Sequence, residues 1–483
     1  MTAASKFAIE RPVLLGYEQR GNAVHRSALT MLKRLFQSGL ALILAISLAL
    51  PSTLAQAQSR GLSLVRDAET EALVRDYATP LMKAAGLRPG SVEFIIVNSP
   101  GFNAFVSGRG LFINTGLLLQ AESPDEVIAV IAHELGHIIG GHQTRLRERM
   151  ENARRIARWT SLLGVGIAAA GAVAGSGGAA QAGAAVATGG GSFAMRDILQ
   201  YRRGEETSAD RTALRLLNAT KQNPSGLIKT FRRLARASSI IGGRIDPYLR
   251  SHPAPNERIR DLMQGIETSP YRNKPTSPAL IARHDMVRAK LAAYVGGNRY
   301  ARSLLLDKRL SENARLYGRA ITTHLYGSPR RALPMIDRLL KRMPNNPYVH
   351  EMKGEILLRS GRAKQAVPHF RKAVQSDRTN SGFLRVQLGH ALLESGDRKN
   401  LNEAIEQLRK GVSRDPSAVA GYSYLARAYG ETGQTARALL ASAEVAVRTG
   451  RRNEARNFAT RAQKGFKRGE PGWLRAQDII GYK

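Results

Sequence analysis

The segment VIAVIAHELGHIIGG, residues 127–141, is almost entirely apolar, yet two histidines and a glutamate lie in its middle. A helix start precedes it, because Ser123 is a typical N-cap, Pro124 suits the first turn and Glu126 completes a capping box. The apolar side chains that recur at helical spacing are Val127, Ile131, Leu135 and Ile138. The segment therefore predicts a helix that packs into a core and carries ionisable side chains there.

The three ionisable side chains, His133, Glu134 and His137, form the HExxH pattern of zinc proteases. Histidines four residues apart are separated by about 6 Å along a helix axis and about 40° around it, so both can bind one metal ion. Glu134 is turned about 100° from His133, which suits a base acting on a metal-held water. The alternative is a chance match in a core helix, where an unpaired buried glutamate would be costly. We therefore expect one Zn²⁺ per chain.

A catalytic zinc site needs a third protein ligand. The HExxHxxGxxH form would have a histidine where Gln143 stands, so that form is disfavoured. His142 is one residue away and lies on another face of the helix, so we interpret it as an ordinary polar residue. A glutamate from a later helix is the other common solution, and GEETSADRTALRLL, residues 204–217, offers one.

Within this later segment, Glu206 and Asp210 are four residues apart and share a helical face. Glu206 would bind the metal, and Asp210 would accept a hydrogen bond from the outer ring nitrogen of a zinc-binding histidine. Spacing alone does not distinguish Glu205 from Glu206, but the position of Asp210 favours Glu206. The alternative is a solvated acidic first turn, which the helix dipole would also favour.

In chain order, HELGH, ETSAD and SHPAPNERI (residues 251–259) resemble the motifs of the gluzincin proteases that include HtpX and the CAAX prenyl proteases. The similarity is greatest to their soluble periplasmic, BepA-type branch, which adds C-terminal tetratricopeptide repeats. The resemblance implies an α+β, mostly helical fold, in which a gluzincin metalloprotease domain with a small β-sheet precedes an all-α repeat solenoid. It also implies a zinc metalloendopeptidase.

The same resemblance assigns roles to single residues. It implies that His133, His137 and Glu206 are the zinc ligands. Glu134 would be the general base, and His252 would lie over the zinc at the catalytic site and cap or gate it. The alternative for His252 is a turn residue that precedes a proline.

Residues 91–120 read as β runs broken by turn residues and followed by a helix. By resemblance, these strands form a small sheet beside the active-site helix, and its edge strand binds the substrate backbone. The residues of that strand are Asn103, Ala104, Phe105 and Val106. The alternative is an edge strand without a ligand.

The N-terminus predicts a secretory signal over residues 1–57. A basic pair, an apolar run and an A-x-A cleavage site at residues 55–57 follow Met31, which is an alternative start. The apolar run is short for a membrane span, which disfavours an uncleaved anchor. The absence of cysteine excludes thiolate zinc sites, disulfides and a lipoprotein anchor. The expected location is the periplasm.

We expect the protease domain over residues 58–266, a linker over 267–278, and linking helices followed by repeats over 279–483. Within the protease domain, the Gly/Ala-rich segment 161–193 predicts a helical loop or lid that contacts membrane or substrate. A transmembrane helix is the alternative for this segment. The repeats have the tetratricopeptide period, because equivalent glycines stand 34, 35 and 37 residues apart. These glycines are Gly327, Gly361, Gly396 and Gly433.

Two departures from the repeat pattern are visible in the sequence. Lys399 and Asn400 form an apparent insertion in the turn of the third repeat, and a weaker unit around Gly450 and Ala455 would cap the array. Stacked repeats form a concave surface that binds peptide or protein, and the alternative is a scaffold without a ligand.

The net charge of the chain is +35, of which residues 267–483 contribute +23. This excess predicts an anionic partner for the repeats, either an acidic face of the outer-membrane assembly machinery or the anionic membrane surface. The alternative is a general bias of composition. No nucleic-acid motif is present, and we expect no nucleic-acid partner.

Taken with the resemblance, these features predict a periplasmic zinc endopeptidase in outer-membrane protein assembly and quality control. Its substrates would be misfolded or unassembled envelope proteins. The alternative function is a non-enzymatic chaperone or assembly adaptor whose metal is only structural. The three-ligand set disfavours that alternative, because structural zinc is normally closed by four protein ligands.

Overall fold

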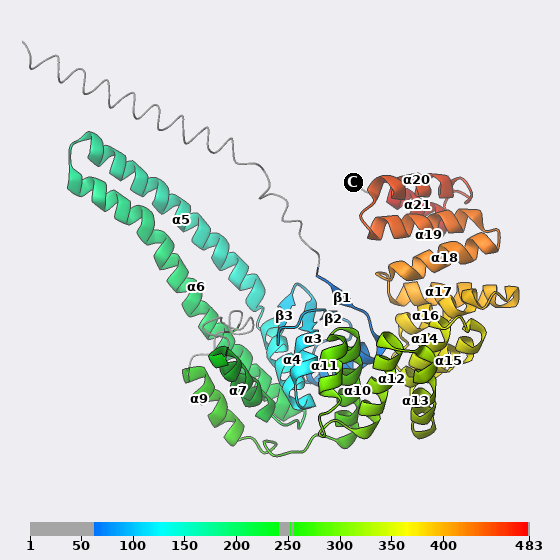
Figure 1. Ribbon diagram of the computed structural model, residues 1–483. Coiled ribbons are helices and arrows are strands. Elements are labelled where there is room, and N and C mark those ends of the chain that lie inside the picture. Colours follow the sequence, from blue (N-terminus) through cyan, green and yellow to red (C-terminus); the bar gives the residue numbers. More distant parts are fainter. Residues whose placement is uncertain (1–61, 241–251, 253–255, 482–483) are drawn as a thin grey trace, which may run out of the picture. The chain divides into compact units, whose positions relative to one another are not determined.

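The computed structural model describes residues 62–240, 252 and 256–481 (Figure 1). The predicted signal segment 1–57 and Met31 lie outside the described residues. The described chain is mostly helical with one small sheet, and helical repeats follow the sheet-containing region, so the predicted fold class is confirmed.

A four-stranded sheet of order β1-β2-β4-β3 lies in the first part of the described chain. Its strands are β1 (Leu64–Val65), β2 (Glu93–Val97), β3 (Ala104–Ser107) and β4 (Gly110–Asn114). The β2–β4 pair is parallel, and the other two pairs are antiparallel. Ile96 pairs with Ile113, and both side chains are buried in the core on one face of the sheet. The sheet therefore has the two-residue β1 at one edge and β3 at the other.

The helices of this region include α4, which is buried along most of its length. They are α2 (Ala68–Ala84), α3 (Thr115–Gln120), α4 (Pro124–Ile139), α5 (His142–Val173), α6 (Gly177–Ala219), α7 (Ser225–Ile240) and α9 (Asn256–Glu267). The predicted capping box at the start of α4 is wrong in detail, because the Ser123 side chain makes no cap hydrogen bond. The Glu126 carboxylate instead accepts from the backbone N–H of Glu122 at 2.9 Å and from Arg233 of α7 at 3.0 Å.

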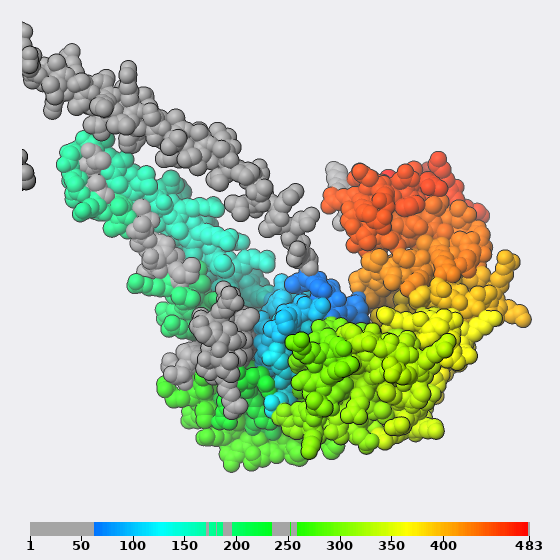
Figure 2. All heavy atoms as spheres, in the orientation of Figure 1, coloured from blue at the N-terminus to red at the C-terminus, as the bar shows by residue number. Residues whose placement is uncertain are grey.

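The Gly/Ala-rich segment 161–193 forms the distal part of a hairpin made by α5 and α6, which pack along each other (Figures 1 and 2). Small residues permit this packing, because a Cβ on Gly183 would lie only 2.3 Å from the backbone nitrogen of Ala168. Among the described helices, none combines the length and apolar character that crossing a membrane requires.

The repeat region consists of paired helices (Figure 1). They are α12 (Glu312–Tyr326), α13 (Pro329–Arg342), α14 (Pro347–Arg359), α15 (Ala363–Ser376), α16 (Gly382–Glu394), α17 (Leu401–Arg414), α18 (Val419–Glu431), α19 (Thr435–Arg448), α20 (Arg452–Gln463) and α21 (Pro471–Gly481). Gly361 and Gly433 adopt positive φ between paired helices, which a side chain would strain. The apparent insertion at Lys399 forms a short 3₁₀ helix, η2 (Arg398–Asn400), before α17.

Two further helices, α10 (Pro278–Tyr294) and α11 (Gly297–Leu304), join the two regions. On α10, the His284 ring bonds the Tyr77 hydroxyl of α2 at 2.9 Å. Lys290 is buried and lies 3.1 Å from Glu351 of α14 and 3.5 Å from Glu69 of α2. These buried polar contacts attach the first repeats to the helix that flanks the sheet.

Candidate metal centre

The metal centre depends on the close approach of α4 to α6. Gly136 faces the backbone of Ala209, and a Cβ at Gly136 would stand 2.8 Å from the Ala209 carbonyl oxygen. Any side chain at this position would therefore separate the two helices. The close approach places His133 and His137 of α4 opposite Glu206 of α6.

Four side chains direct donor atoms to one point: His133, His137, Glu206 and His252. Nε2 of His133 lies 3.1 Å from Nε2 of His137 and 3.4 Å from a Glu206 oxygen. Nε2 of His137 lies 3.5 Å from the other Glu206 oxygen. Nδ1 of His252 is 3.0 Å from Glu206 and 3.3 Å from Nε2 of His133. The structure thus brings together the three predicted ligands and the predicted capping histidine.

These spacings match those of donors around a single ion. Donors at about 2.1 Å from a tetrahedral zinc lie about 3.4 Å from one another. The donor contacts described above run from 3.0 to 3.5 Å, and all four donor atoms lie within 4.8 Å of one another. Two histidines and a carboxylate are also a ligand type that zinc commonly takes. The residues present therefore fit a zinc ion.

Outer contacts hold both histidines of α4 in place. Nδ1 of His133 lies 2.8 Å from Oδ1 of Asp210. Nδ1 of His137 lies 2.9 Å from Nδ1 of His142. Such contacts fix the ring orientation, so that the Nε2 atoms face the shared point.

Arg258 of α9 pairs with the two carboxylates of α6. It is buried, lies 2.9 Å from Glu206 and hydrogen-bonds Asp210 through two guanidinium nitrogens. Glu205, the alternative to Glu206, lies outside the four-residue group. The structure thus places Glu206, and not Glu205, at the shared point.

The protonation states of His137 and Glu206 are those that metal binding requires. Burial and the charge of His133 lower the pKa of His137 to about 2, so its ring is neutral. Although burial opposes ionisation, hydrogen bonds from His133 and His252 hold the pKa of Glu206 well below its ordinary range. Burial would lower the pKa of His133, but its bonds to Asp210 and Glu206 raise it to about 9. A neutral imidazole and an ionised carboxylate are what a metal requires, and binding would displace the His133 proton.

Glu134 lies beside the donor group without belonging to it. Its side chain is 1% exposed, and its Oε1 has no hydrogen-bond partner among the described residues, although Nε2 of His252 stands 3.3 Å away. Burial raises the pKa of this carboxyl. A buried carboxylate oxygen without a hydrogen bond is costly, so this oxygen is suited to a water molecule at the site.

Comparison with known protein families also indicates a peptidase with a metal site. Residues 31–265 match the model of peptidase family M48, and residues 327–381 match a tetratricopeptide repeat model. The chain carries an M48 peptidase domain. Family and fold together make it a metalloprotease with C-terminal repeats.

The chain is also similar to several curated proteins that are named as proteases. The β-barrel assembly-enhancing protease of Escherichia coli K12 is 25% identical over 78% of this chain and 75% of its own length. A putative protease of that name from Vibrio cholerae is 26% identical over 77% and 75%. Metalloprotease LoiP of E. coli K12 is 29% identical, over 36% of this chain and 63% of its own.

The predicted substrate strand lies at an edge of the M48 domain's sheet. β3 begins at Ala104, one residue later than predicted, and pairs only with β4 among the described strands. It also packs against α4, the HExxH helix. The Phe105 ring stacks on Phe112 of β4, with centroids 4.9 Å apart.

Two residues of the M48 site were not identified from the sequence. His142 was interpreted as an ordinary polar residue, but it is 2% exposed and contacts the ring of His137. Its position after the helix end at Gly140 and Gly141 concealed this, because the chain turns there at a positive φ. Arg258 lies within the SHPAPNERI motif, so a motif signal existed, but its target on α6 depends on tertiary packing.

Proposed function

We propose that this metalloprotease binds one Zn²⁺ through His133, His137 and Glu206, and cleaves internal peptide bonds. The observation that carries the proposal is the spacing of the donor atoms, which corresponds to one tetrahedral ion. The M48 family match supports a metal at this point.

Glu134 is the proposed general base. A zinc ion held there would polarise the scissile carbonyl and lower the pKa of an adjacent water. Glu134 accepts the proton of the attacking water and delivers it to the leaving amine. The burial of Glu134 favours this exchange, because a raised pKa brings a carboxylate closer to the proton affinity that a general base needs.

His252 is proposed to restrain the enzyme. Its Nδ1 lies among the donor atoms, where it competes with the water that hydrolysis requires. Asp210 is proposed to orient His133. The substrate backbone is proposed to pair with the edge strand that contains Ala104, Phe105 and Val106, with Asn103 immediately before it.

The periplasm is the proposed location, because the sequence predicts a secretory signal. Misfolded or unassembled envelope proteins are the proposed substrates. The names of the relatives, which refer to β-barrel assembly, support a role in outer-membrane protein assembly and quality control.

The repeats are proposed to bind an acidic partner of the outer-membrane assembly machinery. A cavity of about 690 Å³ on the repeats is lined by Arg385, Arg409, Lys410 and Arg414, with Glu406 as the one acidic side chain. Arg409 and Arg414 are exposed and form no ion pair within the described chain. Protein–protein contact through stacked repeats is consistent with this surface.

Peripheral contact with an anionic membrane is proposed for the α5–α6 hairpin. Trp159 and Leu162 are each 66% exposed, and Val165 is 60% exposed. Arg155 and Arg158 are exposed just before this apolar stretch. Exposed apolar side chains next to arginines are typical of helices that lie in a lipid interface.

A non-enzymatic adaptor is the competing function, since His252 supplies a fourth donor and a closed site is typical of structural zinc. Purified mature protein should contain about one zinc per chain and digest casein. Glu134→Gln should keep the zinc, and its rate of casein digestion should be lower by at least about a hundredfold, because only the base is removed.

The matched control is Glu205→Gln, a neighbouring buried glutamate outside the donor group. It should retain both zinc and activity. Zinc binding by a wild-type protein that cleaves no faster than Glu134→Gln would favour the adaptor.

A further inference from the structure

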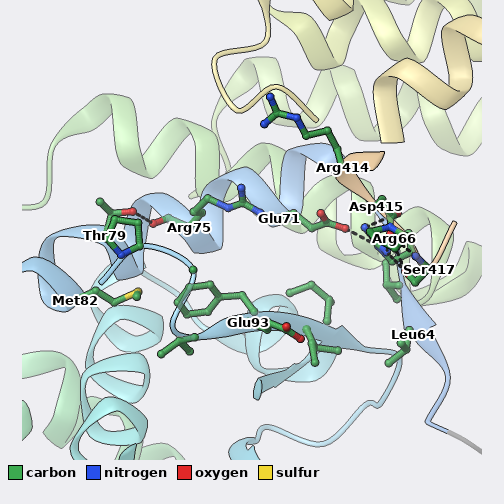
Figure 3. Close-up of a pocket in the computed structure, with 18 of the residues that line it drawn as sticks. Leu64, Arg66, Glu71, Arg75, Thr79, Met82, Glu93, Arg414, Asp415 and Ser417 are labelled. Carbon is green, nitrogen blue, oxygen red and sulfur yellow. Dashed lines mark hydrogen bonds and ion pairs between the residues drawn. The ribbon is translucent and has the colours of Figure 1, made fainter. Parts of the chain in front are cut away.

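A second potential binding site lies at the other edge of the sheet. A cavity of about 970 Å³ is enclosed by β1 and β2, by α2, and by residues 414–417 between α17 and α18 (Figure 3). Its volume is in the range of sites that bind organic ligands or peptide segments. It contains none of the residues of the metal centre.

The cavity occupies the position that a longer β1 would fill. β1 pairs with β2 through Leu64 and Val65 only, and the chain then enters α2. The N–H of Glu93 bonds Arg109 on the β4 side at 2.9 Å. Because backbone groups alternate sides along a strand, those of Phe94 point to the cavity, where no described strand pairs with them. An extended segment placed here would continue the line of β1.

The walls of this position are apolar. Leu64 is 52% exposed, and Val65, Leu87 and Phe94 are half-buried. Met82 closes the α2 side. An added strand would bury alternate side chains against this surface, because successive side chains of a strand point to opposite faces.

Paired charges close one end of the cavity. Arg66 bonds Glu71 at 2.9 Å, and it bonds Asp415 and Ser417 at 2.8 Å each (Figure 3). These bonds connect the β1–α2 turn to the repeat loop. Arg66 therefore pairs with both neighbouring carboxylates, and these three side chains together carry a net charge of −1.

Three other cations line the cavity without such partners. Arg75, Lys83 and Arg414 are exposed, and their side chains form no ion pair or hydrogen bond with any residue that the structure describes. Glu93 is the one lining carboxylate outside the Arg66 group. The whole lining carries four cations and three carboxylates, and its three unpaired cations favour a partner with carboxylates.

We propose that this cavity is a docking site for an extended peptide segment of a partner protein, in which apolar and acidic residues alternate. The segment adds to β2 as a strand antiparallel to it. This site holds a partner at the sheet edge opposite β3, and so it goes beyond the proposed cleavage function. An anionic lipid would share the apolar and cationic contacts, but it could not pair with the backbone of Phe94.

The probe is a dye-labelled, capped peptide of about eight residues, the length of a strand, in which valine alternates with glutamate. Its binding is followed by fluorescence anisotropy with the full-length Glu134→Gln protein, which prevents cleavage. Arg75→Glu combined with Arg414→Glu should weaken binding by about tenfold or more. The matched control is Arg330→Glu with Arg338→Glu, two exposed arginines on α13 outside the cavity, which should leave binding unchanged.

Two N-methylated forms of the probe test the strand pairing. One form carries methyl groups on the odd amides and the other on the even amides, so only one blocks the N–H groups that face β2. One form should lose binding and the other should keep it. Equal binding of both forms would overturn the proposal. So would an absence of peptide binding at about millimolar concentration together with dodecanoate binding that depends on Arg75.

Discussion

The charged side chains of the metal centre are buried and paired, whereas arginines on the repeats are exposed and unpaired among the described residues. At the metal centre, Glu206, Asp210 and Arg258 are buried and paired with one another. On the repeats, Arg409 and Arg414 are exposed and without an ion pair among the described residues. Buried ions cost several kcal/mol unless they are paired, whereas exposed ions cost little and are screened by salt. Substitutions should therefore have large, salt-independent effects at the first region and small, salt-dependent effects at the second.

The largest effect is expected from Glu206→Gln, which replaces an ionised ligand with a neutral amide. Because changes in the residues behind metal ligands already weaken affinity by 10- to 100-fold as a rule, loss of the ligand itself should cost at least about a hundredfold. Zinc affinity measured by competition with a chelator would show this. A weaker zinc affinity in Glu205→Gln, with Glu206→Gln unaffected, would reverse the assignment.

His252→Ala should act in the opposite direction on activity. Removing the fourth donor opens the position that water needs, so basal cleavage or self-cleavage should rise, by roughly tenfold. The measurement is kcat on one peptide substrate. A fall of about a hundredfold would instead indicate that His252 stabilises the oxyanion of the transition state. An unchanged kcat would make it a turn residue.

The buried charges around Lys290 should give a moderate pH effect. Burial raises the pKa of Glu69 to about 7 and of Glu351 to about 8. Both values exceed the ordinary 4.5, so the unfolded chain loses these protons first as pH rises. Stability should therefore fall between about pH 4.5 and pH 8. Tm should fall between pH 5 and pH 8 in the wild-type protein and should fall less in Glu351→Gln. In the exposed control Glu470→Gln, the fall in Tm should equal that of the wild type.

The smallest effects are expected at the exposed charges. Full-length protein should bind phosphatidylglycerol vesicles at low salt and dissociate as salt rises, because exposed charges are screened beyond about 8 Å at physiological ionic strength. A blue shift of Trp159 fluorescence, removed by Leu162→Asp, would place the contact on the hairpin. If vesicle binding instead causes no blue shift and is lost in Arg409→Glu, the membrane contact lies on the repeats. Binding that ignores salt would contradict both.

The sequence allowed strong predictions wherever one helix determines the geometry. His133, Glu134 and His137 lie on a single helix, so their relative positions follow from its period. The same holds for Glu206 and Asp210. The glycine period also identified the paired repeat helices and the insertion at Lys399.

Features that depend on contacts between elements were not predictable in this way. The meeting of α4 with α6 is fixed at Gly136, and the role of Arg258 depends on where α9 packs. The Gly/Ala-rich segment was ambiguous, because its composition suits a loop, a membrane span or a close helical hairpin. The packing of Gly183 against Ala168 selects the hairpin. The two-residue β1 is too short to produce a periodic signal.

The absent side chain at Gly136 has a consequence for how the metal centre could be altered. The joint between α4 and α6 is backbone against backbone, with no side chain acting as a spacer. The distance between the two helices is therefore set by main-chain atoms, which can adjust less than side chains can. A single donor residue on either helix can be replaced while the distance between the helices stays constant. The addition of a single methyl group at residue 136, by contrast, would shift both α4 histidines relative to Glu206 at once.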